Sequence, residues 1–325
     1  MNLAEKVLLF GDIGIDDTIA IIYSYLNDDI DIVGVVADYG NISREHAVAN
    51  INYVRNLFET EEVVDIQVFA GADIPMLSEA PEFVPEIHGE YGLGPIIPPE
   101  AEETVFNENF FEIIEIIETY KDELVIVNIG RLTSLATLFL LYRDLMTKVK
   151  SYYLMGGAFW VPGNITAVSE ANFHGDPVAA QIVLTYAKNV TIIPLNVTQY
   201  AIATPEMVNY IDQVGKAPLV KPLLDYYYDF YKKRDPNVQG SPLHDVLTIM
   251  AVVQEDMFTF NDLPVHIVQA TKGTERGQSI ADIRPFGNLE EETEKDIERH
   301  RIAFQLDYQK FFNRFMSVMT GQLFD

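Results

Sequence analysis

Short apolar runs alternate with longer stretches of mixed apolar and polar residues over most of the chain. The runs have the length and the Val, Ile and Leu content of strands buried inside a sheet, and the longer stretches are long enough for crossover helices. This alternation predicts an α/β fold with a mostly parallel central sheet flanked by helices. The predicted strands are residues 7–10, 30–37, 66–70, 124–129, 152–155 and 190–195, and the predicted helices are residues 15–26, 44–58, 110–120 and 177–187.

The C-terminal part of the chain has a different pattern. Residues 263–270 and 278–284 predict a strand pair joined by a glycine-containing turn, and residues 308–319 predict a closing helix. The proline-rich stretch 75–99 carries the sequence HGEYGLG between strand-like segments, so we interpret it as a functional loop. Because no internal repeat or low-complexity linker divides the sequence, we expect residues 1–325 to form a single domain.

Composition narrows the class of protein. The chain has 325 residues, a hydrophobic content of 48% and a net charge of −27. This charge opposes binding to phosphate backbones and anionic bilayers, so neither nucleic acid nor a membrane is an expected partner. We expect a cytoplasmic protein, because the sequence shows no long apolar run and no signature of a secretion signal. Without cysteine, any metal must be held by oxygen or imidazole.

Three carboxylates follow the first predicted strand, where a helix is expected to begin. Asp12, Asp16 and Asp17 lie close together in sequence, and Gly11 and Gly14 permit a tight turn there. Two interpretations are open at this point. The acids are either ordinary helix-start residues favoured by the helix dipole, or part of a cation site, because crowded anions repel one another unless a positive charge compensates.

Further polar or glycine-rich segments follow the other predicted strands. Ligands of open α/β sheets bind beyond the carboxyl ends of the strands, so these segments are expected to converge on one site. The candidates beyond the three acids are Asn41, the Ile129–Gly130 turn, Met155, Asn164, Glu170, Asn172, His244 and Asp245.

The order of these segments is more informative than any one of them. The chain contains, in sequence, GIDD, GNIS, IHGEYGLG, IGRLTSLA, LMGGAF, GN-x5-EAN-x3-DP, PLHD and TERGQS. Through this ordered set it resembles the inosine-uridine nucleoside hydrolase family over most of its length. The resemblance implies one α/β domain with a Rossmann-like core and a homodimeric or homotetrameric assembly. It also implies hydrolysis of the N-glycosidic bond of ribonucleosides to ribose and free base, with a bound Ca²⁺ ion.

The resemblance implies catalytic and metal-binding roles as well. Asp12, Asp17, Asp245 and the main-chain carbonyl of Ile129 match the calcium ligands, and Asp12 also matches the base that takes a proton from the metal-bound water. We favour His244, which directly precedes Asp245, as the acid that protonates the departing base. These residue types suit the chemistry, because breaking an N-ribosyl bond requires an activated water, anchored hydroxyls and a stabilised leaving group.

Contacts to the sugar follow from the same resemblance. Asp16 and Asn172 match residues that hold the 2′- and 3′-hydroxyls of ribose, and Asn164 and Glu170 match residues that reach the 5′-hydroxyl. The other matched positions of the sugar pocket are Asn41 and Met155.

Three residues are candidates for contacts to the base. His88 matches a pocket position of the family and either contacts the base or stabilises its own turn. Tyr228 and Tyr231 lie three residues apart and share a helical face, where they either contact the base or form a buried packing stripe.

Several positions depart from the family pattern. Phe10 stands where the motif usually opens with another acid, and Ile13 and Arg131 each replace a usual proline. Ala171 replaces an aromatic residue, and Val246 replaces the proline after His-Asp. Loss of an acid near the metal is expected to alter metal affinity, the orientation of the base or substrate preference.

Two other classes of function are weighed against the hydrolase. The first is a non-catalytic or weakly active nucleoside- or ribose-binding paralogue that retains the metal site, which the missing acid at Phe10 motivates. The second is a haloacid-dehalogenase-like phosphatase. It fits poorly, because Asp12 is not followed two residues later by a second acid.

Overall fold

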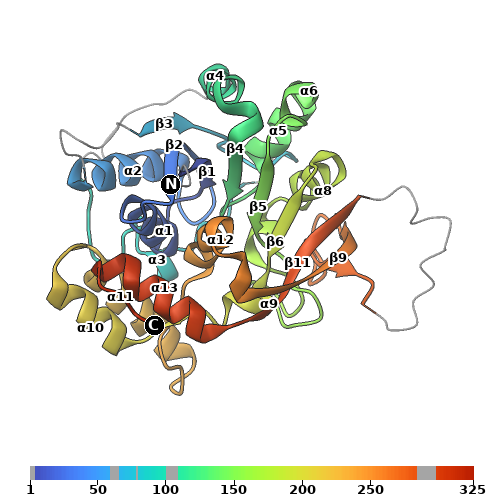
Figure 1. The fold of residues 1–325 in the computed structure, drawn as a ribbon. Helices are drawn as coiled ribbons and strands as arrows, with labels where there is room; N and C mark the ends of the chain where they lie inside the picture. Colours follow the sequence, from blue (N-terminus) through green and yellow to red (C-terminus); the bar gives the residue numbers. More distant parts are fainter. Residues whose placement is uncertain (1–3, 59–65, 78–79, 100–108, 284–297) are drawn as a thin grey trace.

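A nine-stranded sheet forms the centre of the molecule (Figure 1). The structure is a computed structural model that describes residues 4–58, 66–77, 80–99, 109–283 and 298–325. The strand order is β10-β9-β11-β6-β5-β4-β1-β2-β3, and all strands from β11 to β3 run parallel. The strands are β1 (Glu5–Gly11), β2 (Ile30–Ala37), β3 (Gln67–Ala70), β4 (Leu124–Asn128), β5 (Ser151–Met155), β6 (Val190–Ile193), β9 (Phe258–Ile267), β10 (Ser279–Ala281) and β11 (Arg299–Leu306), with β7 (Ile202–Ala203) and β8 (Ser241–Pro242) in a separate small sheet.

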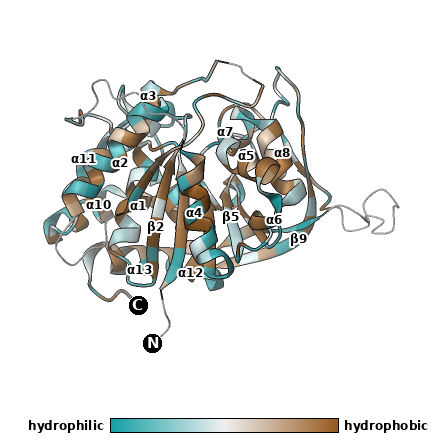
Figure 2. Ribbon diagram, turned by 90° about the horizontal axis from the view of Figure 1, so that it is seen from above, coloured by the Kyte–Doolittle hydropathy of each residue, from teal (hydrophilic) through white to brown (hydrophobic). Residues whose placement is uncertain are grey.

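Helices cover both faces of this sheet, because side chains alternate between two hydrophobic cores. In β1, Val7 and Leu9 belong to one core, and Leu8 and Phe10 belong to the other. Figure 2 shows the apolar strands, in brown, enclosed by helices with hydrophilic outer surfaces. The first core packs against α1 (Ile15–Tyr25), α2 (Arg44–Phe58), α10 (Pro205–Val214), α11 (Val220–Arg234), α12 (His244–Val253) and α13 (Tyr308–Thr320), and the second packs against α4 (Phe110–Tyr120), α5 (Thr133–Leu141), α6 (Arg143–Met146) and α8 (Pro177–Tyr186).

The predicted fold class is confirmed, and several elements match closely. The strand at 30–37 and the helices at 44–58 and 110–120 agree residue for residue with β2, α2 and α4. The strand expected at 190–195 is shorter, because Pro194 has no N–H for the ladder and α9 (Leu195–Thr198) begins directly after it. The proline-rich stretch contains one helical turn, α3 (Pro85–His88).

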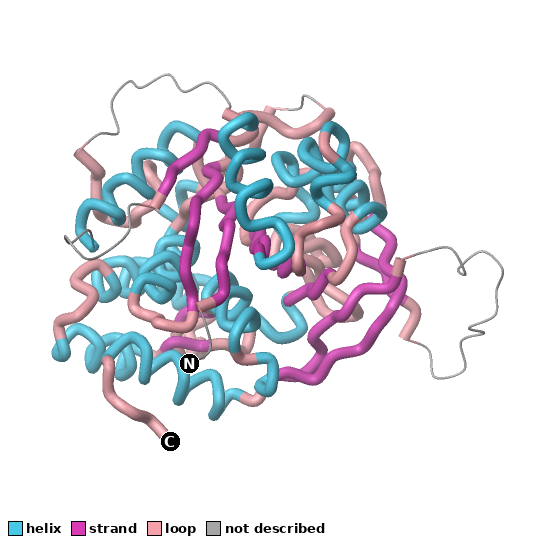
Figure 3. The backbone as a smooth tube through the Cα atoms, turned by 45° about the horizontal axis from the view of Figure 1, so that its top comes forward, coloured by secondary structure: helices cyan, strands magenta, loops and turns pink. Residues whose placement is uncertain are grey.

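The C-terminal edge of the sheet departs from the parallel pattern. β9 pairs antiparallel with β10, as the predicted strand pair requires, although β9 begins earlier and Arg284 lies outside the described residues. β11 was not predicted, yet it lies between β9 and β6 (Figure 1). Figure 3 shows the strands, in magenta, among the helices, in cyan. Its sequence RHRIAFQL includes the polar and apolar alternation typical of a strand. The helix expected at 308–319 is confirmed as α13.

The middle of the sheet provides a crevice. β1 pairs with β2 on one side and with β4 on the other, and the helices that follow β1 and β4 cover opposite faces. Such a switch point opens a space at the carboxyl ends of the strands, where the polar segments after β1, β2, β4 and β5 meet. Among the described residues, no helix has the length and apolar character needed to cross a membrane.

Candidate active site

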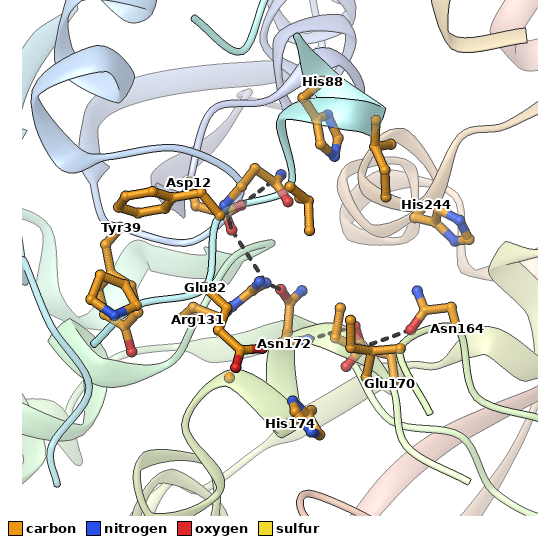
Figure 4. A pocket seen from close by; sticks show the side chains of 18 of the residues that line it. Asp12, Tyr39, Glu82, His88, Arg131, Asn164, Glu170, Asn172, His174 and His244 are labelled. Carbon is orange, nitrogen blue, oxygen red and sulfur yellow. Dashed lines mark hydrogen bonds and ion pairs between the residues drawn. The ribbon is translucent and has the colours of Figure 1, made fainter. Parts of the chain in front are cut away.

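A cavity of about 890 Å³ lies at this crevice (Figure 4). It brings together segments that are far apart in the sequence. Two predicted site residues do not line it: Asp17 is buried beneath Asp12, to which it is hydrogen-bonded, and Tyr228 lies elsewhere on α11. The predicted residues that do line the cavity are Asp12, Asp16, Asn41, His88, Ile129, Met155, Asn164, Glu170, Asn172, Tyr231, His244 and Asp245.

The loop between β1 and α1 is tightly packed around its acids. The carboxylate of Asp17 accepts hydrogen bonds from the backbone N–H groups of Asp12 (3.2 Å) and Gly14 (2.9 Å). Ile13 has a left-handed φ of 27°, a strained conformation for a β-branched residue. A Cβ at Gly14 would lie 2.4 Å from Nδ1 of His88, so glycine allows the loop to approach that ring. The loop therefore holds its acids at fixed positions.

Asp16, Asp17 and Asp245, which we call the acid cluster, are buried, and one carboxylate oxygen from each lies within 4.8 Å of the other two. Burial raises the pKa of Asp16 to about 6 and the pKa values of Asp17 and Asp245 well above their usual range, and mutual repulsion adds to the effect. A divalent cation would stabilise the charged forms, and oxygen donors are what hard cations prefer. The described residues thus include a buried acidic cluster that can bind a metal ion.

Asp12 stands beside the acid cluster rather than within it. Its carboxylate accepts hydrogen bonds from the backbone N–H (2.8 Å) and Nδ2 (3.1 Å) of Asn41, and it lies 3.3 Å from Nη1 of Arg131. The same Nδ2 donates to Asp17 (3.1 Å), so Asn41 links Asp12 to the cluster. A Cβ at Gly40 would lie only 1.8 Å from Oδ2 of Asp12. Burial raises the pKa of Asp12, and the positive charge of Arg131 opposes this shift.

Arg131, Glu170 and Asn172, which we call the hydrogen-bonded wall, lie below Asp12 and His88 in Figure 4. Nη1 of Arg131 donates to Oδ1 of Asn172 (2.6 Å). Because that contact identifies the amide oxygen, Nδ2 of Asn172 faces the carbonyl of Ile129 (2.9 Å), to which it donates. The carbonyl predicted as a metal ligand therefore also accepts a hydrogen bond from the wall.

Glu170 completes the wall by capping α7 (Ala171–Gly175). Its carboxylate accepts hydrogen bonds from the backbone N–H groups of Asn172 (2.7 Å), Phe173 (3.1 Å) and Gly157 (3.0 Å). Nearby, Oδ1 of the exposed Asn164 accepts the backbone N–H of Ala171 (2.9 Å). Both residues predicted to reach the 5′-hydroxyl thus also fix the start of this helix.

Among the histidines that line the cavity, His88 and His244 are buried and neutral. Nδ1 of His88 accepts the backbone N–H of Ile15 (3.0 Å), so its proton is on Nε2. Nδ1 of His244 lies 2.8 Å from Oγ1 of Thr198. Burial lowers the pKa of His88 to about 3 and the pKa of His244 to about 4. Each neutral ring can therefore donate one hydrogen bond through its N–H group at pH 7.

The tyrosines of α11 require a correction. Tyr228 does not line the cavity, and its hydroxyl donates to the carbonyl of Val238 (3.3 Å). Tyr227 lines it instead, together with Tyr231, and their hydroxyls lie 3.2 Å apart. Residues four apart are closer in direction around a helix than residues three apart, which explains why the pair is Tyr227 and Tyr231. The hydroxyl of Tyr227 also interacts with Asp16.

Among the site residues that sequence reasoning missed are Arg131, Tyr227 and Thr198. Arg131 was noted only as a departure, although a charged residue directly after a strand-end glycine is a usable signal. Tyr227 was detectable from its spacing to Tyr231. Thr198 carries no local signal, because only the fold brings α9 next to His244.

Comparison with known proteins decides the family. The family model described as inosine-uridine preferring nucleoside hydrolase matches residues 7–313. The chain belongs to this family. It is 31% identical to uridine nucleosidase 1 of Arabidopsis thaliana, over 86% of this chain and 82% of that protein. It is 29% identical to the inosine-uridine preferring nucleoside hydrolase of Leishmania major, over 95% and 96% of the two chains.

A solved structure agrees with this nucleoside hydrolase assignment. The purine-preferring ribonucleoside hydrolase from Gardnerella vaginalis superposes with a TM-score of 0.84 and 27% identity, over 97% of this chain and 98% of that chain. The match to the family model includes every site residue described above. The predicted family and fold are therefore confirmed. The names of these relatives differ in their nucleosides, so similarity alone does not fix the base.

Proposed function

We propose that this protein hydrolyses the N-glycosidic bond of ribonucleosides to ribose and free base. One observation carries the proposal: Asp16 and Asp245 of the acid cluster line one cavity with Asp12 and His244, so groups suited to a cation, an attacking water and a departing base are close together. Membership of the nucleoside hydrolase family supports the same reaction. No observation favours the non-catalytic alternative.

We propose Ca²⁺ as the cofactor. Asp12, Asp17, Asp245 and the carbonyl of Ile129 would hold it, and this all-oxygen donor set fits a hard cation. The burial of these carboxylates supports the proposal, because burial raises their pKa values and a nearby cation would stabilise their charged forms. When bound, the ion supplies positive charge that acidifies water and anchors ribose hydroxyls.

Asp12 acts as the general base of the proposed reaction. Two hydrogen bonds from Asn41 hold its carboxylate in one orientation, which favours attack of water along one direction. As the C–N bond breaks, the carboxylate accepts a proton from the attacking water. Its raised pKa makes it a stronger acceptor than an exposed aspartate.

The sugar is bound by groups around the acid cluster. Asp16 accepts hydrogen bonds from the 2′- and 3′-hydroxyls, and Asn172 contacts the same diol. Asn164 and Glu170 receive the 5′-hydroxyl, and their existing bonds to α7 hold them in place. The remaining sugar contacts come from Asn41 and Met155.

His244 acts as the general acid. When Nδ1 accepts from Thr198, the ring proton is on Nε2, and this N–H donates a hydrogen bond to the departing base. The hydrogen bond stabilises the negative charge that develops on the base. Full proton transfer requires the ring to take up a second proton first, after which the base leaves neutral and the ring returns to its neutral form. His88, Tyr231 and Tyr227 contact the base from α3 and α11, and Tyr227 takes the place first given to Tyr228.

We also propose that residues 1–325 form one catalytic domain in a cytoplasmic homodimer or homotetramer. Support for one domain comes from the first hydrophobic core, which contains Val7 near the N-terminus and Met319 near the C-terminus. Light scattering coupled to size-exclusion chromatography would measure the assembly, and a monomer would contradict that part.

A panel of purine and pyrimidine ribonucleosides, assayed with and without a calcium chelator, tests the reaction. We expect release of reducing sugar that the chelator abolishes and added Ca²⁺ restores. Asp12→Asn is expected to lower kcat by about 10²–10⁴-fold while the protein still folds. Binding of ribonucleosides by calorimetry without turnover would contradict the proposal and favour the non-catalytic alternative.

A further inference from the structure

Arg131 places a buried guanidinium beside Asp12, one of the proposed metal ligands. The residue is only 6% exposed and lies in the segment after β4, next to the Ile129–Gly130 turn. Nη1 lies 3.3 Å from Oδ2 of Asp12 and 2.6 Å from Oδ1 of Asn172 (Figure 4). Arg131 therefore contacts the proposed base and the proposed ribose-binding amide at the same time.

The surrounding backbone leaves space for this side chain. A Cβ at Gly175, the last residue of α7, would lie 2.3 Å from Nε and 2.4 Å from Cδ of Arg131. Every residue other than glycine would displace the arginine there. The position of the guanidinium thus depends on a specific neighbour, which distinguishes Arg131 from an arginine folded over a surface.

The charge of Arg131 has a predictable effect on any cation bound nearby. A guanidinium carries a positive charge. In a buried site, where water screens charge poorly, it attracts Asp12 and repels a divalent ion held by Asp12 and the acid cluster. The apolar and fully buried Phe10, next to this segment, adds no negative charge to offset it.

We propose that Arg131 is a positioning residue with two effects: its charge weakens the affinity of the site for Ca²⁺, and its hydrogen bonds hold Asp12 and Asn172 in register for the reaction. The proposal rests on the metal site and the reaction proposed above. The two effects separate experimentally, because one depends on charge and the other on the shape of the guanidinium.

Calcium affinity tests the effect of charge. Isothermal titration calorimetry on the full chain would compare wild type with Arg131→Met, which removes the charge, and Arg131→Lys, which retains it. We expect Arg131→Met to bind Ca²⁺ at least about tenfold more tightly than wild type, and Arg131→Lys to stay within about threefold. Arg143→Met is the matched control, because Arg143 is exposed, lies outside the cavity and is expected to leave the affinity unchanged.

Steady-state kinetics at saturating Ca²⁺ tests the second effect, by which the hydrogen bonds of Arg131 hold Asp12 and Asn172 in position. Arg131→Lys and Gly175→Ala both keep a positive charge and disturb the geometry, so each is expected to lower kcat about tenfold or more while the calcium Kd changes little. Gly175→Ala is compatible with its backbone, because Gly175 has no left-handed φ. This variant also keeps the proposal testable if Arg131→Met does not fold.

Different outcomes overturn different proposals. Unchanged or weaker calcium binding by folded Arg131→Met, or equally tightened binding by Arg131→Lys, overturns the effect of charge. An unchanged kcat in both Arg131→Lys and Gly175→Ala overturns the effect of position. Tighter calcium binding by Arg131→Met in a protein that hydrolyses no nucleoside would support the effect of charge and contradict only the proposed reaction.

Discussion

The acid cluster and the hydrogen-bonded wall are neighbouring parts of one site that differ in how many carboxylates they hold close together. In the acid cluster, Asp16, Asp17 and Asp245 lie so close together that burial and repulsion raise their pKa values. In the wall, the Glu170 carboxylate is matched by backbone N–H groups. The crowded charges of the acid cluster can therefore be compensated by a cation, whereas the hydrogen bonds of the wall hold Glu170 and Asn172 in place.

The strongest test of this comparison is removal of one charge from the acid cluster. Asp245→Asn keeps the size of the side chain and is expected to reduce turnover by at least about 10²-fold, because the cation loses a ligand. The metal-free protein should be as stable as wild type or more stable, since repulsion is relieved. Thermal unfolding with and without Ca²⁺ measures this, and a calcium-induced rise in Tm equal to that of wild type would contradict the assignment.

His244 is expected to have the next largest effect. His244→Gln should lower kcat by about 10²-fold with little change in KM, because it removes the proton donor but not the sugar contacts. Since burial lowers the pKa of His244 to about 4, the ring stays neutral above about pH 5, and its protonation should cause no loss of wild-type activity between pH 6 and 8.

The same shift has a consequence for stability in acid. The folded state takes up the proton of His244 near pH 4 and the unfolded state near pH 6.5, so stability is lost as the pH falls through this window. His244→Gln should lose less stability over that range, as urea unfolding at pH 7 and pH 5 would show. An equal loss in both proteins would argue against the buried neutral ring.

A substitution in the hydrogen-bonded wall is expected to lower the stability of the protein. Glu170→Gln keeps the shape but weakens the cap of α7, so the unfolding free energy should fall by about 1–2 kcal/mol. The calcium-induced change in Tm should persist, because the acid cluster is untouched. Glu118→Gln, on the exposed face of α4, is the control and should change little. If Glu170→Gln lost the calcium-induced change in Tm, the wall and the acid cluster would not be separate in function.

The smallest expected effect concerns the corrected tyrosine. Tyr227→Phe removes a hydroxyl that interacts with Asp16 and should raise KM several-fold, or by about 1 kcal/mol of binding. Tyr228→Phe should leave KM within about twofold, since that hydroxyl faces Val238. Equal changes in KM for both variants would contradict this correction and support Tyr228 as a residue that contacts the base.

Much of the parallel sheet could be predicted because each buried strand is a continuous apolar run, as in β2, and each crossover helix has its own periodicity, as in α2 and α4. β11 was harder, because its half-polar sequence becomes a strand by pairing with β9 and β6. Likewise, the sequence identifies Asp12 and Asp245 as candidate acids. It does not predict that Asp12 lies beside Arg131 while Asp245 lies beside other acids.

The strand pattern of the core, the family and twelve of the residues that line the cavity follow from the amino-acid sequence, because they depend on local periodicity and on ordered motifs. The folded arrangement is needed to see that Tyr227 replaces Tyr228, that Thr198 meets His244, and that Arg131 pairs with Asp12 and Asn172. The physical reason is distance along the chain. Contacts between segments separated by tens or hundreds of residues depend on how helices and strands pack, and that packing sets the charge around Asp12.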